Sequence, residues 1–168
     1  MVLDRENKIV YACLSPRTNE EVLDHFCQLY QYIKVVFTAA DSNGNLIYHT
    51  NVMLCIGSRF AVVCLEAIQE NKERMLVMES LKASGKKEII PISLQQLHHF
   101  AGNMLELENT DGDRILVLST QAYQSLNQQQ ISSLEKYATI LHSSLNTIET
   151  AGGGSARCML AEIFITPK

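Results

Sequence analysis

The chain of 168 residues has the length of one ordinary domain, and 46% hydrophobic residues are enough to fill a core. Its formal net charge of -4 gives no reason to expect a nucleic-acid partner, and the one dense basic run, residues 82–87, falls at an expected helix end. No apolar run approaches the roughly 18 residues that cross a bilayer, and the first residues lack the layout of a signal peptide. We therefore expect a cytoplasmic protein without a nucleic-acid or membrane partner.

The first forty residues predict two strands, a helix and a third strand. Two short apolar runs on either side of a polar turn are typical of a strand pair. Thr18 and Glu21 fit a capping box, in which the Thr18 hydroxyl bonds the third helical amide, so a helix is expected to begin there. A β-branched run then closes the unit before an Asn-Gly turn. The predicted strands are residues 1–3, 8–14 and 33–39, and the helix runs to about Gln31.

The same order of elements occurs twice more. In the second copy the helix stops at Gly85, a residue type that commonly closes helices. The third copy carries a stripe of apolar residues at helical spacing, which predicts its helix. The stripe consists of Ile131, Leu134, Ala138 and Leu141. The predicted strands are residues 52–56, 59–65 and 88–92 in the second copy and 104–107, 115–119 and 144–149 in the third, and the second helix spans about 69–84.

These copies form a repeat of about 51 residues, and its next copy begins at Met159. The sequence therefore predicts an α/β fold of three ββαβ units, followed by the first strand of a fourth. Units of this kind, stacked radially, make a propeller-like array with the helices outside. The predicted units are residues 1–40, 44–92 and 103–150, and the lone strand is Met159–Ile165.

A glycine run, Gly152 to Gly154, delivers Cys158 to the start of the last apolar segment. Three glycines permit backbone angles that are closed to other residues, and they allow the close approach to a ligand that an exposed nucleophile needs. A flexible turn before a buried cysteine explains the same residues equally well, because free cysteines are usually core residues. The five cysteines form no metal-binding spacing, so we expect neither a metal nor another cofactor.

Radial stacking directs the residues just before each first strand toward one centre. They are His49 and Asn51 in the second unit, Asn103 in the third and Cys158 in the fourth. A cysteine beside a histidine suits nucleophilic catalysis, with a thiolate as the attacker and an imidazole as the general acid and base. His49 and Asn103 are also ordinary turn or cap residues, and their equivalence within the repeat is what favours a site.

The segments around these residues resemble the amidinotransferase, or guanidino-group-modifying, superfamily, and most of all its citrulline-utilisation hydrolase type. The resemblance covers the whole chain and implies the pentein fold, an α/β propeller of five units. The segments that carry it are residues 48–53, 100–107 and 152–159, with Asp4-Arg5, residues 12–18 and Ile148-Glu149 also fitting.

The resemblance implies a hydrolase or transferase that acts on the guanidino or ureido carbon of an arginine-like or citrulline-like amino acid. Cys158 would form a covalent thio-intermediate, and His49 would protonate the leaving amine and activate water or an acceptor amine. Asn51, Asn103 and Arg157 would bind substrate. Many relatives have an aspartate where this chain has Asn51. An amide can hydrogen-bond the substrate but holds no negative charge beside a cation, so Asn51 fits a neutral ureido group somewhat better than a charged guanidino group. Arg157 could also favour the thiolate, or it is an ordinary surface residue.

The family needs five units, whereas this chain supplies three and the start of a fourth, so residues 1–168 resemble one truncated domain, the family's C-terminal portion. In the family an acidic residue precedes the strand that corresponds to residues 1–3, and the earlier units supply further substrate-binding groups. Either the chain is a fragment, from a truncated or split gene or an internal start, or a complementing N-terminal chain supplies these groups. Open strand edges and apolar faces at the ends of a partial ring also predict self-association. The alternative is an inactive remnant that acts as a binding or oligomerising domain.

Overall fold

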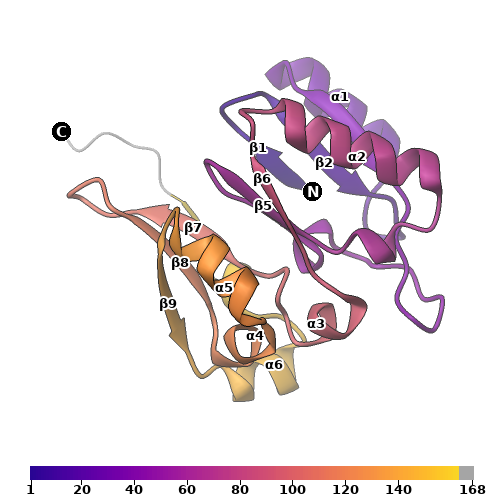
Figure 1. Ribbon diagram of the computed structural model, residues 1–168. Helices are drawn as coiled ribbons and strands as arrows, with labels where there is room; N and C mark the ends of the chain where they lie inside the picture. The colour runs from indigo at the N-terminus through magenta and orange to yellow at the C-terminus, as the bar shows by residue number, and fades with distance from the viewer. Residues whose placement is uncertain (163–168) are drawn as a thin grey trace.

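The computed structural model describes residues 1–162 and contains three three-stranded sheets in succession (Figure 1). In each sheet the first two strands are antiparallel and the second and third are parallel. The expected series of three ββαβ units is therefore confirmed. The strands are β1 (Val2–Asp4), β2 (Ile9–Cys13) and β3 (Ile33–Phe37); β4 (Leu54–Ile56), β5 (Phe60–Val63) and β6 (Glu88–Pro91); and β7 (Leu105–Glu108), β8 (Arg114–Ser119) and β9 (Thr139–Ser143).

Helices connect the second and third strands of every unit and also join the units. Within residues 1–162, no helix is long and apolar enough to cross a membrane. The crossover helices are α1 (Glu20–Tyr30), α2 (Asn71–Ala83), and the pair α4 (Thr120–Ser125) and α5 (Gln128–Glu135). The remaining helices are α3 (Leu94–His98), α6 (Asn146–Gly152), α7 (Ala156–Met159) and the 3-10 turns η1 (Thr50–Val52) and η2 (Leu65–Ala67).

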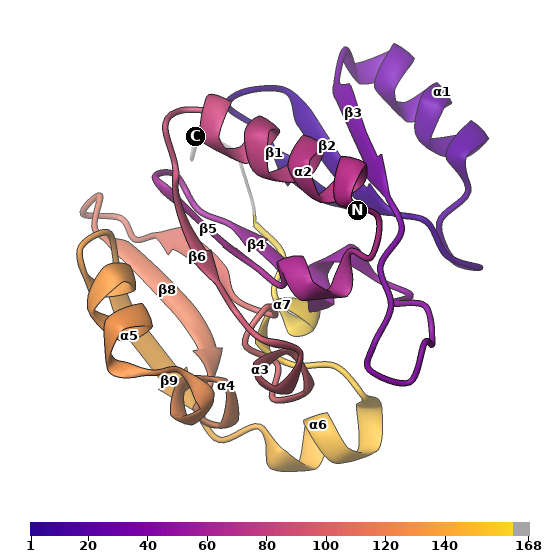
Figure 2. The ribbon, with the colours of Figure 1, turned by 45° about the vertical axis from the view of Figure 1, so that its right-hand side comes forward.

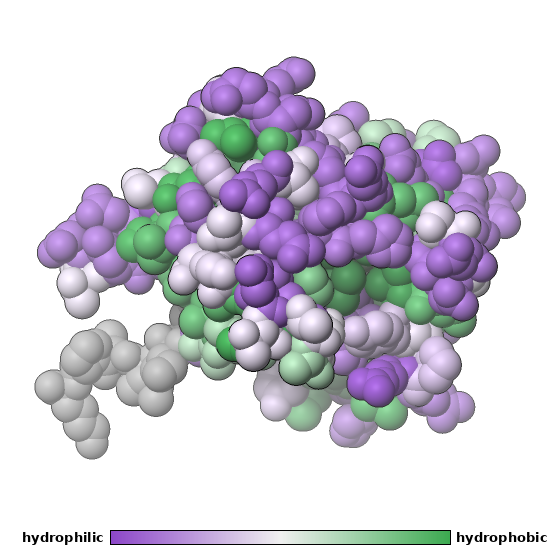
Figure 3. Space-filling model, turned by 90° about the horizontal axis from the view of Figure 1, so that it is seen from below, coloured by the Kyte–Doolittle hydropathy of each residue, from purple (hydrophilic) through white to green (hydrophobic). Residues whose placement is uncertain are grey.

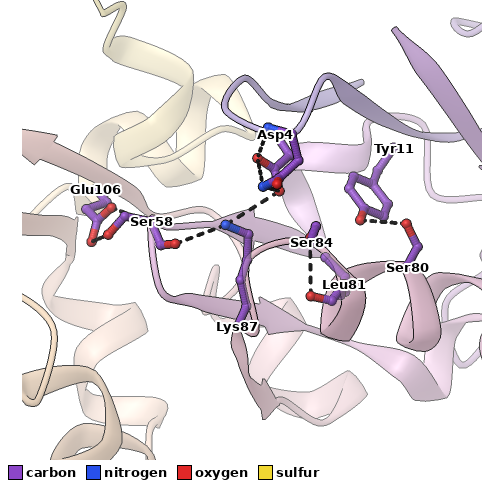
Figure 4. A network of polar contacts seen from close by, with 9 residues as sticks. Asp4, Tyr11, Ser58, Ser80, Leu81, Ser84, Lys87 and Glu106 are labelled. Carbon is purple, nitrogen blue, oxygen red and sulfur yellow. Dashed lines mark hydrogen bonds and ion pairs between the residues drawn. The ribbon is translucent and has the colours of Figure 1, made fainter.

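The helix of one unit packs against the outer strand of the unit before it. α2 lies on β3 (Figure 2). The hydroxyl groups of Tyr11 and Ser80 form a 2.9 Å hydrogen bond between the two units (Figure 4). In the third unit the Gln130 side chain of α5 donates to the Pro91 carbonyl of β6 at 2.7 Å. One main hydrophobic core extends through all three units, and the first strands β1, β4 and β7 lie beside one another in succession.

The first helix begins later than the capping box predicts. α1 starts at Glu20, and the residue that caps it is Asn19, whose side chain accepts a hydrogen bond from the Val22 amide at 3.2 Å. The Thr18 amide instead bonds the Ser15 carbonyl in the preceding turn. The expectation for Thr18 is wrong because its neighbour has an equally suitable side chain one position closer to the helix.

The predicted helix and last strand of the third unit are also wrong. α5 ends at Glu135, so Ala138 lies beyond it and Leu141 is part of β9. Most of residues 144–149 belongs to α6 rather than to a strand. The apolar stripe is helical only as far as Leu134, because Thr139 and Ile140 are β-branched and pair with β8.

The expected lone strand Met159–Ile165 is not found where the structure describes the chain. Met159 is the last residue of α7, and Leu160 to Glu162 have no regular secondary structure. The rest of the predicted strand lies outside the described residues.

Three buried charged side chains join the units at one end of the first strands (Figure 4). The Lys87 ammonium lies 3.5 Å from the Asp4 carboxylate of the first unit and donates to the Ser58 carbonyl at 3.0 Å. Ser58 in turn donates to the Glu106 carboxylate of the third unit from its amide at 2.6 Å and from its hydroxyl at 3.2 Å. The side chains of Lys87 and Asp4 are 1% and 3% exposed, so neither charge is compensated by water.

Replacing Lys87 should destabilise the fold strongly. Lys87→Met leaves the buried Asp4 carboxylate without its cation, which typically costs about 3–5 kcal/mol. The control is Lys136→Met, because Lys136 is 59% exposed in its pair with Glu88 and such pairs contribute below about 1 kcal/mol. Urea unfolding measures both free energies, and equal losses in the two variants would contradict the importance of the buried network.

Candidate active site

Cys158 lies on the exposed surface, in the single turn α7 that follows the glycine run. Gly153 has a positive φ of 66°, and a side chain at Gly154 would meet Cys158 at 3.1 Å, so the run brings the backbone close to the cysteine. The alternative of a buried cysteine is therefore wrong for Cys158. It describes the other cysteines better, since Cys13, Cys55 and Cys64 are buried and Cys27 is partly buried.

Two asparagine amides reach the sulfur of Cys158. The Asn103 side-chain nitrogen lies 3.3 Å from Sγ and the Asn51 side-chain nitrogen lies 3.9 Å from it. Asn103 also donates to the Asn51 carbonyl at 2.9 Å and accepts from the Arg157 amide at 3.1 Å. The structure thus brings together four of the five predicted residues, from three separate stretches of the chain.

Gly102 allows the segments of Asn51 and Asn103 to touch. A side chain at Gly102 would lie 2.4 Å from the Val52 carbonyl oxygen and 2.9 Å from Met53, both backbone contacts. The buried Met53 and Met104 follow the two asparagines and fix both segments in the main core. In the sequence, Gly102 stands out only as part of residues 100–107, which resemble the guanidino-modifying superfamily. A glycine directly before a site residue is nevertheless a sign that two backbones approach each other closely.

Glu149 and Ser155 hold the turn that precedes Cys158. The Ser155 hydroxyl donates to Glu149 Oε1 at 2.6 Å, and both side chains are buried. The Ser155 carbonyl then accepts the Cys158 amide at 3.0 Å. Among the described residues, Glu149 Oε2 has no hydrogen-bond partner. The sequence predicts a strand at Glu149 and no role for Ser155, because neither residue stands directly before the first strand of a unit.

His49 precedes η1 and is half-buried against Tyr48, with ring centroids 4.7 Å apart. Within residues 1–162, no hydrogen bond joins His49 to Cys158. The Tyr48 hydroxyl does reach the Gly153 carbonyl at 3.5 Å, which connects this segment to the glycine run. Partial burial, followed by the nearby Arg17 guanidinium, lowers the pKa of His49, so the ring is neutral at pH 7.

Arg157 contributes its backbone and its side chain to different places. Its amide binds Asn103 beside the sulfur, whereas its guanidinium donates to the Met104 carbonyl at 3.4 Å. The guanidinium belongs to the lining of a cavity of about 150 Å³, which Lys87 and Glu106 of the buried network also line. Among residues 1–162, no group of three or more His, Cys, Asp or Glu side chains is arranged to hold a metal ion.

The fold, with an exposed cysteine next to two asparagine amides, places the chain in the pentein superfamily of guanidino-modifying enzymes. Residues 1–165 match the family model of eukaryotic N,N-dimethylarginine dimethylhydrolase, and the chain belongs to this family. The expected superfamily is confirmed, while the citrulline-utilisation subgroup remains a prediction. A sequence search of curated proteins gives no match.

Solved structures with the same fold include those of ArgZ, an arginine dihydrolase from the ornithine-ammonia cycle in cyanobacteria. The apo structure has a TM-score of 0.72 at 15% identity, and the match covers 98% of this chain and 25% of ArgZ. The ArgZ N-terminal domain bound to product has a TM-score of 0.71 at 16% identity, covering 94% of this chain and 52% of that domain. A variant of the domain, covalently bound to a reaction intermediate, has a TM-score of 0.70 at 16% identity with the same coverage.

Substitution of Gly102 should loosen the site. Gly102→Ala places a methyl group against the backbone of Val52 and Met53, and overpacking of this kind costs about 1–3 kcal/mol. Gly152→Ala is the control, because its new methyl group would meet only Ile148, at 4.0 Å. Thermal unfolding compares the two variants, and we expect a clear loss for Gly102→Ala alone. Equal melting temperatures would show that the two segments can separate freely.

The ionisation of His49 should depend on Arg17. We expect the pKa of His49 below its usual value of about 6.5 and closer to that value in Arg17→Ala, by NMR titration of the ring. Because the folded chain then binds this proton more weakly than the unfolded chain, His49 destabilises the fold only as the pH falls below about 6.5.

Arg59→Ala is the matched control for Arg17→Ala. Arg59 lies 5.4 Å from the Tyr137 ring, as Arg17 lies 5.5 Å from the Tyr48 ring. It should leave the His49 titration unchanged. An identical His49 titration in Arg17→Ala and the native chain would disprove the electrostatic effect of Arg17.

Proposed function

We propose that Cys158 is the nucleophile of a hydrolase that cleaves a C–N bond at the guanidino carbon of an arginine-like amino acid. The observation that carries this proposal is the exposed sulfur within hydrogen-bond reach of the Asn103 amide. The family name supports a methylated arginine as substrate. The ArgZ domain, which has the same fold, is an arginine dihydrolase domain that was captured with a covalent reaction intermediate.

The reaction has two steps at one carbon. The Cys158 thiolate forms an S–C bond to the guanidino carbon, and the C–N bond to the leaving amine breaks as that amine takes a proton. Water then attacks the thio-intermediate, gives up its proton, and releases a ureido product and the thiolate. Because its lowered pKa keeps the ring neutral at pH 7, His49 first takes up the proton that the Cys158 thiol releases and passes it to the leaving amine. The ring is then neutral again and accepts the proton of the attacking water.

The side chains around the sulfur would orient the planar substrate. Asn51 is only partly buried, and its side-chain nitrogen lies 3.9 Å from Cys158 Sγ. As an amide in place of the aspartate of many relatives, it can hydrogen-bond a ureido oxygen as well as a guanidino nitrogen. Of the other two residues expected to bind substrate, Asn103 has protein partners at both ends of its amide, and the Arg157 guanidinium donates to the Met104 carbonyl. A citrulline-like ureido substrate, and transfer to an acceptor amine instead of water, belong to the same proposal.

The chain spans about half the length of the ArgZ N-terminal domain that it matches. We propose that further ββαβ units complete the substrate site, either from a complementing chain or through self-association. Several large apolar side chains of the first unit are exposed, Val22 to 70%, Leu29 to 63% and Ile33 to 67%. Figure 3 shows the molecule from below, where other hydrophobic residues are visible between hydrophilic ones.

The free state of all five cysteines agrees with a cytoplasmic location.

An inactive binding or oligomerising domain is the second candidate. This candidate is favoured by one observation, the absence of a hydrogen bond between His49 and Cys158 among the described residues. Catalytic hydrogen bonds often shorten only when substrate binds, so the hydrolase remains the first candidate.

The deciding experiment follows the consumption of arginine, N,N-dimethylarginine and citrulline by the purified chain. We expect little turnover by the chain alone and a gain on the order of 10³-fold when a chain with the family's N-terminal units is added, because substrate orientation then improves. Cys158→Ala should abolish the gained activity, whereas Cys27→Ala should retain it, since Cys27 lies on α1 away from the site. No turnover in any combination would favour the second candidate, and turnover that survives Cys158→Ala would show that Cys158 is not the nucleophile.

A further inference from the structure

The side-chain amide of Asn103 is more buried than that of Asn51, and protein atoms occupy both of its ends. Asn103 is 1% exposed, whereas Asn51 is only partly buried. The Asn103 nitrogen has two hydrogens and two partners within reach, the Asn51 carbonyl at 2.9 Å and Cys158 Sγ at 3.3 Å. Its oxygen accepts the Arg157 amide at 3.1 Å. Both ends of the amide are therefore engaged by protein atoms, and little of it is exposed to a substrate.

The backbone partners fix which way the Asn103 amide faces. A backbone amide can only donate and a carbonyl can only accept, so Arg157 requires the oxygen of Asn103 on its side and Asn51 requires the nitrogen on the other. The second hydrogen of that nitrogen is then directed at Cys158. The sulfur is the acceptor in this contact, and an anionic sulfur accepts a hydrogen bond more strongly than a neutral thiol.

We propose that Asn103 positions Cys158 and stabilises its thiolate, and that it does not bind the substrate. This inference rests on the proposed nucleophilic role of Cys158. The neutral thiol has a poorer contact with Asn103, since its hydrogen would have to reach the amide oxygen, which lies 3.7 Å from the sulfur. Asn51, at 3.9 Å from the sulfur, contributes less to the thiolate and remains the asparagine for the substrate.

The rate of alkylation by iodoacetamide tests this directly, because only the thiolate reacts. Cys27→Ser provides the background, since Cys13, Cys55 and Cys64 are buried and Cys158 is then the only exposed thiol. Asn103→Asp removes the donated hydrogen and places a negative charge beside the sulfur, and Asn103→Ala removes the donor alone. We expect Cys158 to react at least about tenfold more slowly at pH 7 in Asn103→Asp, and more slowly to a smaller degree in Asn103→Ala.

The effect must depend on pH if it acts through the thiolate. At pH 9.5 or above the difference between the variants should shrink to about twofold, because the thiol loses its proton in all of them. The matched control is Asn127→Asp, which introduces the same charge at the N-cap of α5, where aspartate caps equally well. It should leave the alkylation rate unchanged at both pH values.

Two results would overturn the inference. The first is unchanged alkylation at pH 7 in both Asn103 variants while their circular dichroism and melting temperatures remain native. The second applies even if neither variant folds, and it compares Cys158 with a small free thiol, N-acetylcysteine amide, because burial and Asp24 raise the pKa of Cys27. A rate for native Cys158 that falls from pH 9.5 to pH 7 as steeply as that of the free thiol would show that the thiolate has no special stabilisation.

These measurements need no substrate, so they are independent of the turnover assay. A reactive, Asn103-dependent thiolate without turnover would refute the hydrolase and leave the role of Asn103 intact. Turnover that depends on Cys158, together with alkylation that is independent of Asn103, would support the hydrolase and refute the role of Asn103.

Discussion

The buried ammonium of Lys87 is the interaction on which the arrangement of the three units depends. It lies between the Asp4 carboxylate of the first unit and the Ser58 carbonyl of the second, and Ser58 is bound in turn by Glu106 of the third. Charges this deeply buried are tolerated only with their partners in place, so the network restricts how neighbouring units can be placed relative to one another. Apolar packing alone would allow more than one such placement, because it has little directional preference.

The same strands carry this constraint to the other end, where the candidate active site lies. Asn51 comes before β4 and Ser58 comes after it, while Asn103 comes before β7 and Glu106 lies within it. Hydrogen bonds between the two segments at both ends show that β4 and β7 run in the same direction. A shift of one unit relative to the other would separate Asn103 from Asn51 as well as Ser58 from Glu106.

The sequence predicted the features that repeat and missed the ones that do not. Equivalent positions in successive units were enough to bring Asn51, Asn103 and Cys158 together. Periodicity failed in the third unit, where an apolar stripe continues from α5 into β9 without a break in spacing. It also could not reveal the Glu149–Ser155 bond or the direction of the Arg157 guanidinium, because both depend on side-chain orientation within one segment.

Within residues 1–162 His49 has no hydrogen bond to the sulfur, which is consistent with different residues stabilising the thiolate and transferring protons. A thiolate that relied on an imidazolium for stability would need a protonated histidine beside it, whereas burial and Arg17 keep the His49 ring neutral. The Asn103 amide can hold the anionic sulfur without carrying a charge or giving up a proton. In the proposed reaction His49 is then left for proton exchange, since no hydrogen bond joins its ring to the sulfur within residues 1–162.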